Sequence, residues 1–157
     1  MGKTRSHRFT PEHADRLAMR LLGQRRTRLG GLELNHARRV AATLSGRGDE
    51  QLISAALLHD VLEKTDTTRE ELLDLTGNEA VVALVSIVTR GPTEAYRTYL
   101  QRCASDPGGY PLKHADLQDK VVTSDVAVPA AVAARLRQQA RQRLHLLDLF
   151  ARWQELR

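Results

Sequence analysis

Apolar residues recur at helical spacing along nearly the whole chain, and glycine, proline or capping residues end each stretch. Near the N-terminus, Leu17, Leu21 and Leu22 form such a stripe between Thr10-Pro11 and Gly23. An apolar stripe of this period is typical of an amphipathic helix, which must bury the stripe against neighbouring helices. The sequence therefore predicts an all-α fold, a compact helical bundle.

Start and stop signals set the expected helix boundaries. The pattern predicts helices over residues 11–22, from near 35 to 46, and over 50–64, 69–76, 79–90, 94–105, 111–123 and 129–154. Residues 24–31 and 106–109 read as a loop and a turn. The β-branched stretch 79–90 also fits a strand, but its helical neighbours and the Gly91-Pro92 stop favour a helix.

Length and composition limit the class of protein. A chain of 157 residues is the size of one domain, so we expect residues 1–157 to form a single domain. Hydrophobic residues make up 41% and charged residues 27%, which argues against disorder. No apolar run is long enough to span a bilayer or to follow the basic N-terminus as a signal peptide. The single cysteine, Cys103, fits a reducing cytoplasm, which is the expected location.

The positive charge is concentrated at the start of the chain. Residues 1–40 contain ten Lys or Arg and three Asp or Glu, although the formal net charge of the whole chain is only +5. This distribution indicates an anionic partner, either a phosphorylated small molecule or nucleic acid. Aromatic residues make up only 4%, which disfavours stacking on single strands and makes nucleic acid the weaker alternative without excluding it.

One polar pair interrupts an apolar helix. His59-Asp60 follows the nearly all-apolar stretch 53–58, where an unpaired polar group would be costly to bury. Glu63 stands four residues after His59 and three after Asp60, so it shares their helix face, and His36 and Asp116 lie on other predicted helices. A satisfied hydrogen bond in the core would explain the pair alone. Two imidazoles and two carboxylates from three helices could instead converge on one divalent cation.

These residues carry a resemblance to a known family. The order His36, His59-Asp60, Asp116 resembles the H…HD…D signature of the HD-domain metal-dependent phosphohydrolases. The stretches 55–65, 67–72 and 112–117 are similar to the RelA/SpoT hydrolase branch, and the match spans about residues 13–123. With no synthetase domain following, the chain resembles the small stand-alone alarmone hydrolases.

The resemblance implies a fold, an ion and a reaction. It implies a helical HD bundle with His36, His59, Asp60 and Asp116 as ligands of Mn²⁺, or of another divalent transition metal. The implied activity is removal of the 3′-pyrophosphate from (p)ppGpp, a phosphorylated nucleotide, with Glu63 orienting or deprotonating the attacking water. The remaining phosphates need cations. The expected substrate-binding residues are Arg25, Arg26, Arg28, Arg90 and Lys113.

Departures from the family pattern leave alternatives open. Lys64 stands at a position where the branch has Asp. It lies four residues after Asp60, so its ammonium group can pair with the Asp60 carboxylate or bind a substrate phosphate. We count it with Glu63 among the catalytic residues. The Arg and Asn that follow the last ligand in the branch are also replaced, by Leu117 and Lys120. The alternatives are a nucleotide phosphatase with a different substrate, or a weakened HD domain that binds a nucleotide, a nucleic acid or a protein. The oligomeric state is left open.

Overall fold

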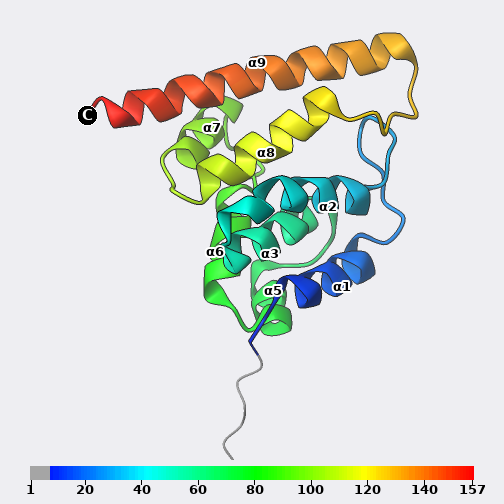
Figure 1. Cartoon of the computed structure of the whole chain (residues 1–157), viewed down its shortest axis with the longest axis vertical. Coiled ribbons are helices and arrows are strands. Elements are labelled where there is room, and N and C mark those ends of the chain that lie inside the picture. Colours follow the sequence, from blue (N-terminus) through cyan, green and yellow to red (C-terminus); the bar gives the residue numbers. More distant parts are fainter. Residues whose placement is uncertain (1–7) are drawn as a thin grey trace, which may run out of the picture.

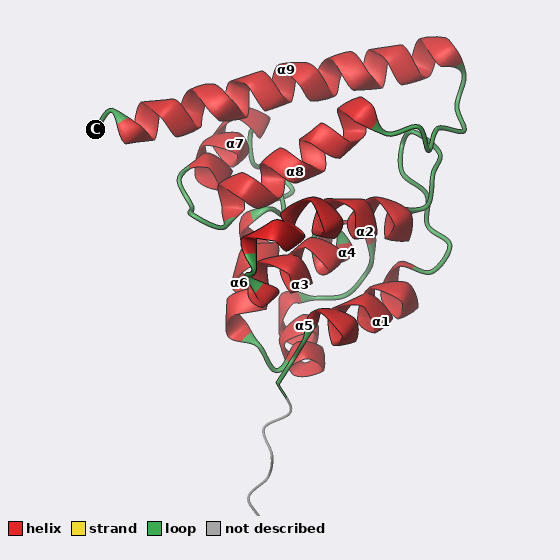
Figure 2. Cartoon of the chain, viewed as in Figure 1, coloured by secondary structure: helices red, strands yellow, loops and turns green. Residues whose placement is uncertain are grey.

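A computed structural model describes residues 8–157. Residues 1–7, with Lys3 and Arg5 of the basic N-terminal stretch, lie outside the described part. The α-helices are α1 (Pro11–Leu22), α2 (Glu33–Leu44), α3 (Glu50–Leu58), α4 (Val61–Lys64), α5 (Arg69–Thr76), α6 (Glu79–Ile87), α7 (Tyr96–Ala104), α8 (Gly109–Val122) and α9 (Ala130–Glu155), with a 3₁₀ turn at Ser45–Arg47. Residues 8–157 contain no strand (Figure 2), so the predicted all-α fold is confirmed.

The helices pack in successive layers. The long helix α9 crosses one side of the molecule over α7 and α8, and α8 lies between α9 and α2 (Figure 1). Helix α3 contacts α1, α2 and α6. Buried apolar residues from each of the helices α1 to α9 form a single cluster. Helix α9 is the longest described helix, and no described helix combines the length and apolar character needed to cross a membrane.

Side-chain caps explain several helix starts. The Thr10 side chain accepts a hydrogen bond from the amide of His13 at the start of α1, and Asp49 accepts from the first turn of α3. Thr68 and Glu71 form a reciprocal capping box at α5, which ends at Gly77 with φ of +58°. The β-branched stretch forms helix α6, which Asn78 caps at its start; the helix ends at Ile87, three residues before the predicted end.

Several predicted helix boundaries are wrong. The helix expected over 50–64 breaks after Leu58, and the chain turns at His59-Asp60 before the short α4 begins. The ring of His59 hydrogen-bonds to the carbonyl of Ala56, one of the last carbonyls of α3. The helix expected from residue 94 begins at Tyr96, because residues 91–94 form a turn closed by the carboxylate of Glu94.

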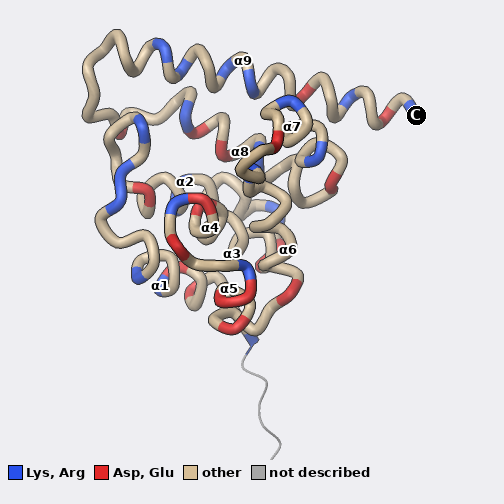
Figure 3. Tube along the Cα trace, turned by 180° about the vertical axis from the view of Figure 1, so that it is seen from behind, with Lys and Arg blue, Asp and Glu red and all other residues tan. Residues whose placement is uncertain are grey.

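The loop between α1 and α2 folds back against the connection between α8 and α9. Isolated backbone bridges join Arg26 to Leu32 and Gly30 to Val126. Basic residues lie along this loop and recur along α9, while acidic residues cluster on α5 (Figure 3). The loop therefore brings positive charge to the end of α2 that carries His36.

Candidate metal centre and active site

The four residues predicted as metal ligands meet in one buried cluster. His36 comes from the first turns of α2, His59 and Asp60 from the turn between α3 and α4, and Asp116 from the middle of α8. Their exposed fractions are 1, 3, 8 and 2%. The His36 Nε2 atom lies 3.0 Å from Oδ1 of Asp116 and 3.8 Å from Oδ2 of Asp60. One ligand atom from each of His36, His59 and Asp60 lies within 4.8 Å of the others.

The nitrogen atoms of His59 show that the cluster suits a cation. Its Nδ1 lies 2.7 Å from the carbonyl oxygen of Ala56, to which it donates. Its Nε2 is buried and makes no hydrogen bond, although oxygens of Asp60 and Asp116 lie 3.3 and 3.6 Å away. A buried polar atom without a hydrogen-bond partner is costly, and imidazole nitrogens beside two carboxylates are a donor set for a divalent transition metal. The residues present therefore fit the ion that the resemblance implies.

Strong fields inside the cluster shift several pKa values. Burial disfavours the charged form of His59, but the charge of Asp60 and the neighbouring Asp116 outweigh it and raise the pKa of His59 to about 10. The pKa of His36 is also raised, because its hydrogen bonds to carboxylates outweigh burial. Burial raises the pKa of Asp60, but the adjacent charge on His59 dominates and lowers it. The carboxylates thus stay ionised in a buried place, as metal ligands must.

Two lysines bracket the Asp116 carboxylate. The Lys113 Nζ lies 2.6 Å from one oxygen, and the Lys120 Nζ lies 2.8 Å from the other. Burial opposes ionisation of Asp116, yet these two charges hold its pKa well below the usual range. The pKa of each lysine is raised, because the attraction of Asp116 outweighs burial. Asp116 is therefore shared between the cluster and the surrounding cations.

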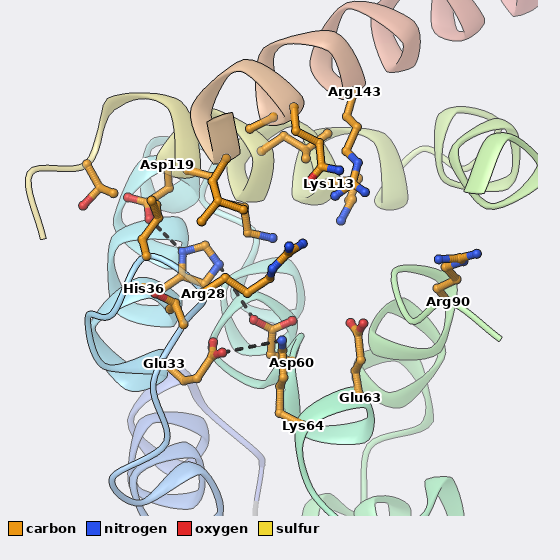
Figure 4. A pocket seen from close by; sticks show the side chains of 18 of the residues that line it. Arg28, Glu33, His36, Asp60, Glu63, Lys64, Arg90, Lys113, Asp119 and Arg143 are labelled. Carbon is orange, nitrogen blue, oxygen red and sulfur yellow. Dashed lines mark hydrogen bonds and ion pairs between the residues drawn. The ribbon is translucent and has the colours of Figure 1, made fainter. Parts of the chain in front are cut away.

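A cavity of about 240 Å³ opens beside the cluster. Its lining includes the predicted residues Arg28, Glu63, Lys64, Arg90 and Lys113. In Figure 4 the carboxylate of Glu63 points toward the cavity, and the cationic side chains approach it from several elements. The cluster thus forms the acidic floor of a cavity with basic walls.

Arg25 and Arg26 are not among the residues that line this cavity. The Arg25 Nε donates to the backbone carbonyl of Lys64 at 2.8 Å, and Arg26 donates to the carbonyl of Gly30 at 2.8 Å. Both side chains tie the loop to its surroundings. Of the three loop arginines predicted to bind substrate, Arg28 alone lines the cavity.

Lys64 pairs with a residue that the sequence analysis did not single out. Its Nζ lies 3.7 Å from Oε1 of Glu33, which is only 2% exposed, and no ion pair joins Lys64 to Asp60 within the described chain. Lys64 pairs with Glu33 in place of Asp60, because the turn at His59-Asp60 and the placement of Glu33 on α2 offer it a different carboxylate (Figure 4). Burial and the charge of Asp60 raise the pKa of Glu33.

Several other site residues were missed from sequence. The Asp119 Oδ2 lies 2.7 Å from Nδ1 of His36, and Arg39 donates to both oxygens of Asp119 at 2.8 and 3.1 Å. Tyr96 and Arg143 line the cavity, with the Arg143 guanidinium 4.0 Å from the centre of the Tyr96 ring. These partners lie far apart in sequence, and only the spacing of Asp119 after Asp116, one turn of helix, gave a local signal.

The fold and the site define a class of protein: an all-helical domain with a buried His/Asp cluster at the floor of a cationic cavity. The sequence profile described as "HD domain" matches residues 14–98, more than half of the chain. The chain belongs to the HD-domain family, which confirms the family assigned from the motif.

Two relatives of known name are similar to this chain in sequence. The chain is 36% identical over 128 residues to a guanosine-3′,5′-bis(diphosphate) 3′-pyrophosphohydrolase of Aquifex aeolicus (strain VF5), covering 72% of this chain and 18% of that protein. It is 44% identical over 64 residues to the enzyme of this name, MESH1, of Danio rerio, covering 39% of this chain and 33% of that protein. The chain therefore matches only a fifth to a third of the length of these relatives.

The solved structure shows the fold alone. It belongs to work on a metazoan ortholog of SpoT that hydrolyses ppGpp. The TM-score is 0.65 at 24% identity, with 96% of this chain and 94% of that chain covered. The helical arrangement thus extends over nearly the whole chain, including α8 and α9, which lie beyond the matched family profile.

Proposed function

We propose that this protein is a metal-dependent phosphohydrolase that removes the 3′-pyrophosphate from guanosine 3′,5′-bis(diphosphate). One observation carries the proposal: the unpartnered Nε2 of His59 faces two carboxylates and a second histidine at the floor of a cation-lined cavity. The relatives named above act on this nucleotide, which supports the choice of substrate.

His36, His59, Asp60 and Asp116 would hold one divalent cation. Two imidazole nitrogens and carboxylate oxygens suit Mn²⁺, which the family resemblance favours, and other divalent transition metals. When bound, such an ion supplies Lewis-acid polarisation of a phosphoryl oxygen and lowers the pKa of water. The protein fixes the donors in advance, since His36 and Asp116 lie within packed helices and His59 and Asp60 lie in the turn that joins α3 to α4.

Glu63 is positioned to act as the general base. It stands on α4, directly after the turn that presents His59 and Asp60, and its carboxylate faces the cavity (Figure 4). A carboxylate at this place can accept the proton of an attacking water. Lys64, the next residue, presents an ammonium group on the same cavity wall while paired with Glu33. We assign it to the binding of a substrate phosphate.

The cationic walls supply charge for the other phosphates. Arg28, Lys113 and Arg143 reach the cavity from the α1–α2 loop, α8 and α9. The guanidiniums of Arg90 and Arg143 lie 5.5 and 4.0 Å from the centre of the Tyr96 ring. Such contacts hold the two cations in place without neutralising them. A nucleotide with phosphates at both ends of its ribose suits a cavity with positive charge on several sides.

A second candidate is hydrolysis of another phosphorylated nucleotide by the same centre. Lys120 donates to Asp116, and Lys64 faces Glu33, so two cations stand where the family pattern has Asn and Asp. Additional positive charge beside the bond that is cleaved favours a substrate whose reacting phosphate is compact and highly charged. This observation concerns the substrate and leaves the metal centre unchanged.

Product analysis tests the proposal. The Mn²⁺-loaded protein is incubated with guanosine 3′,5′-bis(diphosphate) and a panel of other nucleotides, and the leaving group is identified. Pyrophosphate and guanosine 5′-diphosphate are the expected products. Orthophosphate from another nucleotide would favour the second candidate. Absence of turnover, together with absence of Mn²⁺ binding, would leave a binding module instead.

A further inference from the structure

Both ring nitrogens of His36 are held by carboxylates of α8. Nε2 lies 3.0 Å from Oδ1 of Asp116, and Nδ1 lies 2.7 Å from Oδ2 of Asp119, one helical turn further on. His36 is buried, with an exposed fraction of 1%. Its orientation is therefore set by these two contacts rather than by water.

The carboxylate of Asp119 is itself held in place by Arg39. The Arg39 Nε lies 2.8 Å from Oδ1 and its NH2 group 3.1 Å from Oδ2, a two-pronged contact that leaves the carboxylate one orientation. The Arg39 NH1 group also donates to Asp125 at 3.2 Å, which anchors the guanidinium at its other end. Asp119 is 8% exposed, so this pairing takes place largely out of solvent.

We propose that Asp119 is a positioning residue for the metal centre: held by Arg39, it fixes the proton of His36 on Nδ1 and directs the lone pair of Nε2 at the cluster. This inference rests on the proposed metal centre. A carboxylate on the far nitrogen of a ligating histidine fixes its tautomer and ring orientation and increases its basicity as a ligand. His59 obtains the same arrangement from a backbone carbonyl, through its 2.7 Å contact with Ala56. Each histidine is thus held at Nδ1, and its Nε2 faces the carboxylates of the cluster.

The test compares Asp119→Ala and Asp119→Asn with Asp125→Asn. The last variant is a matched control, because it also removes a carboxylate partner of Arg39 but does not contact His36. Binding of Mn²⁺ is measured by calorimetry, and the Nδ1 proton of His36 is followed by NMR in the Zn²⁺-loaded protein. Far-UV circular dichroism checks that each variant is folded.

We expect Asp119→Ala to weaken Mn²⁺ binding by about 10–100-fold and to abolish the protected Nδ1 proton signal of His36. Asp119→Asn retains an acceptor oxygen without the charge and is expected to lie between Asp119→Ala and the wild type. Asp125→Asn is expected to match the wild type in both measurements.

Two results would overturn the inference in distinguishable ways. Wild-type Mn²⁺ affinity and an unchanged Nδ1 proton in folded Asp119→Ala would remove Asp119 from its role and leave the metal centre intact. A wild-type protein that binds no Mn²⁺ would overturn the metal centre and, with it, the role assigned to Asp119. An equal loss of affinity in Asp125→Asn would show a general effect of disturbing Arg39, and would also count against a specific role for Asp119.

Discussion

At the scale of single residues, His59 and Glu63 separate metal binding from turnover. We expect His59→Ala to weaken Mn²⁺ binding by at least about 100-fold, because it removes the donor atom that has no other partner. Glu63→Gln keeps the shape of the side chain but cannot accept a proton, so kcat is expected to fall by about 10²–10⁴-fold at unchanged Mn²⁺ affinity. Calorimetry measures Mn²⁺ binding and initial rates measure turnover for both variants. Glu70→Gln, at an exposed position of α5, is the control. Full activity of Glu63→Gln would exclude it as the base.

The sequence identified His59 and Asp60 because they interrupt an apolar helical stretch, and His36 and Asp116 because they complete the order of the H…HD…D signature. Asp119 and Arg39 could not be found in the same way. Their importance comes from contacts between residues about 80 positions apart, such as the pair Arg39 and Asp119. A surface helix carries many such charges, and only the packing of α2 against α8 selects the ones that meet.

Cys103 gives a prediction for the dependence of stability on pH. Its thiol is buried in α7, and burial raises its pKa from 9.0 to about 11. The unfolded chain therefore loses this proton first as the pH rises, so the contribution is complete below pH 9 and is lost between pH 9 and 11. A shift of this size corresponds to about 2–3 kcal/mol.

The measurement is urea unfolding of the wild type and Cys103→Ala between pH 8 and 11. The substitution lowers stability at every pH because it leaves a small cavity. The difference between the two proteins is expected to shrink as the pH rises. A constant difference over this range would contradict the raised pKa of Cys103.

At the scale of elements, the helix ends that carry a capping residue could be predicted from the sequence. The break after Leu58, which follows an apolar run, could not. Thr10 and Asp49 cap the starts of their helices, and Gly77 caps the end of its helix, where the sequence places these boundaries. No glycine or proline marks the turn at His59-Asp60, so the pattern predicts one helix through residue 64. The turn nevertheless determines the site, because it places Glu63 on a separate short helix beside the cavity.

The α1–α2 loop yields a prediction through Gly30. Its φ is +96°, and a Cβ atom there would lie 2.9–3.1 Å from Ala127, including two backbone atoms. We expect Gly30→Ala to lower the free energy of unfolding by about 2–4 kcal/mol, from backbone strain and from the close contact. Because the loop carries Arg28 into the cavity, KM is expected to rise as well.

Gly48→Ala is the matched control for this substitution. Gly48 has φ of +68° but nothing within 4 Å of an added Cβ, so it carries the backbone cost alone, about 1 kcal/mol. Denaturant unfolding and initial rates measure both variants. An equal loss of stability in the two proteins would show that the packing of the loop against Ala127 contributes nothing.

At the scale of the whole molecule, the cluster connects helices that are distant in sequence. The contact between His36 and Asp116 joins residues 80 positions apart and links α2 to α8. The apolar pattern is enough to predict a helical bundle, because every stripe must be buried. It does not determine which polar groups face one another inside, since this depends on the angles and register at which the helices pack.

A divalent cation bound by this cluster would stabilise the fold through the same connection. In the unfolded chain the donors of α2, the α3–α4 turn and α8 are dispersed, so the ion binds the folded state preferentially. At a free Mn²⁺ concentration 100 times its dissociation constant, we expect the free energy of unfolding to rise by about 2.7 kcal/mol, and EDTA to reverse the change. Urea unfolding with and without Mn²⁺ measures this, and His59→Ala, which lacks one donor, is expected to show almost no change. Equal stabilisation of His59→Ala would mean that the ion acts on other carboxylates of the surface, and that the buried cluster is not the site that joins these helices.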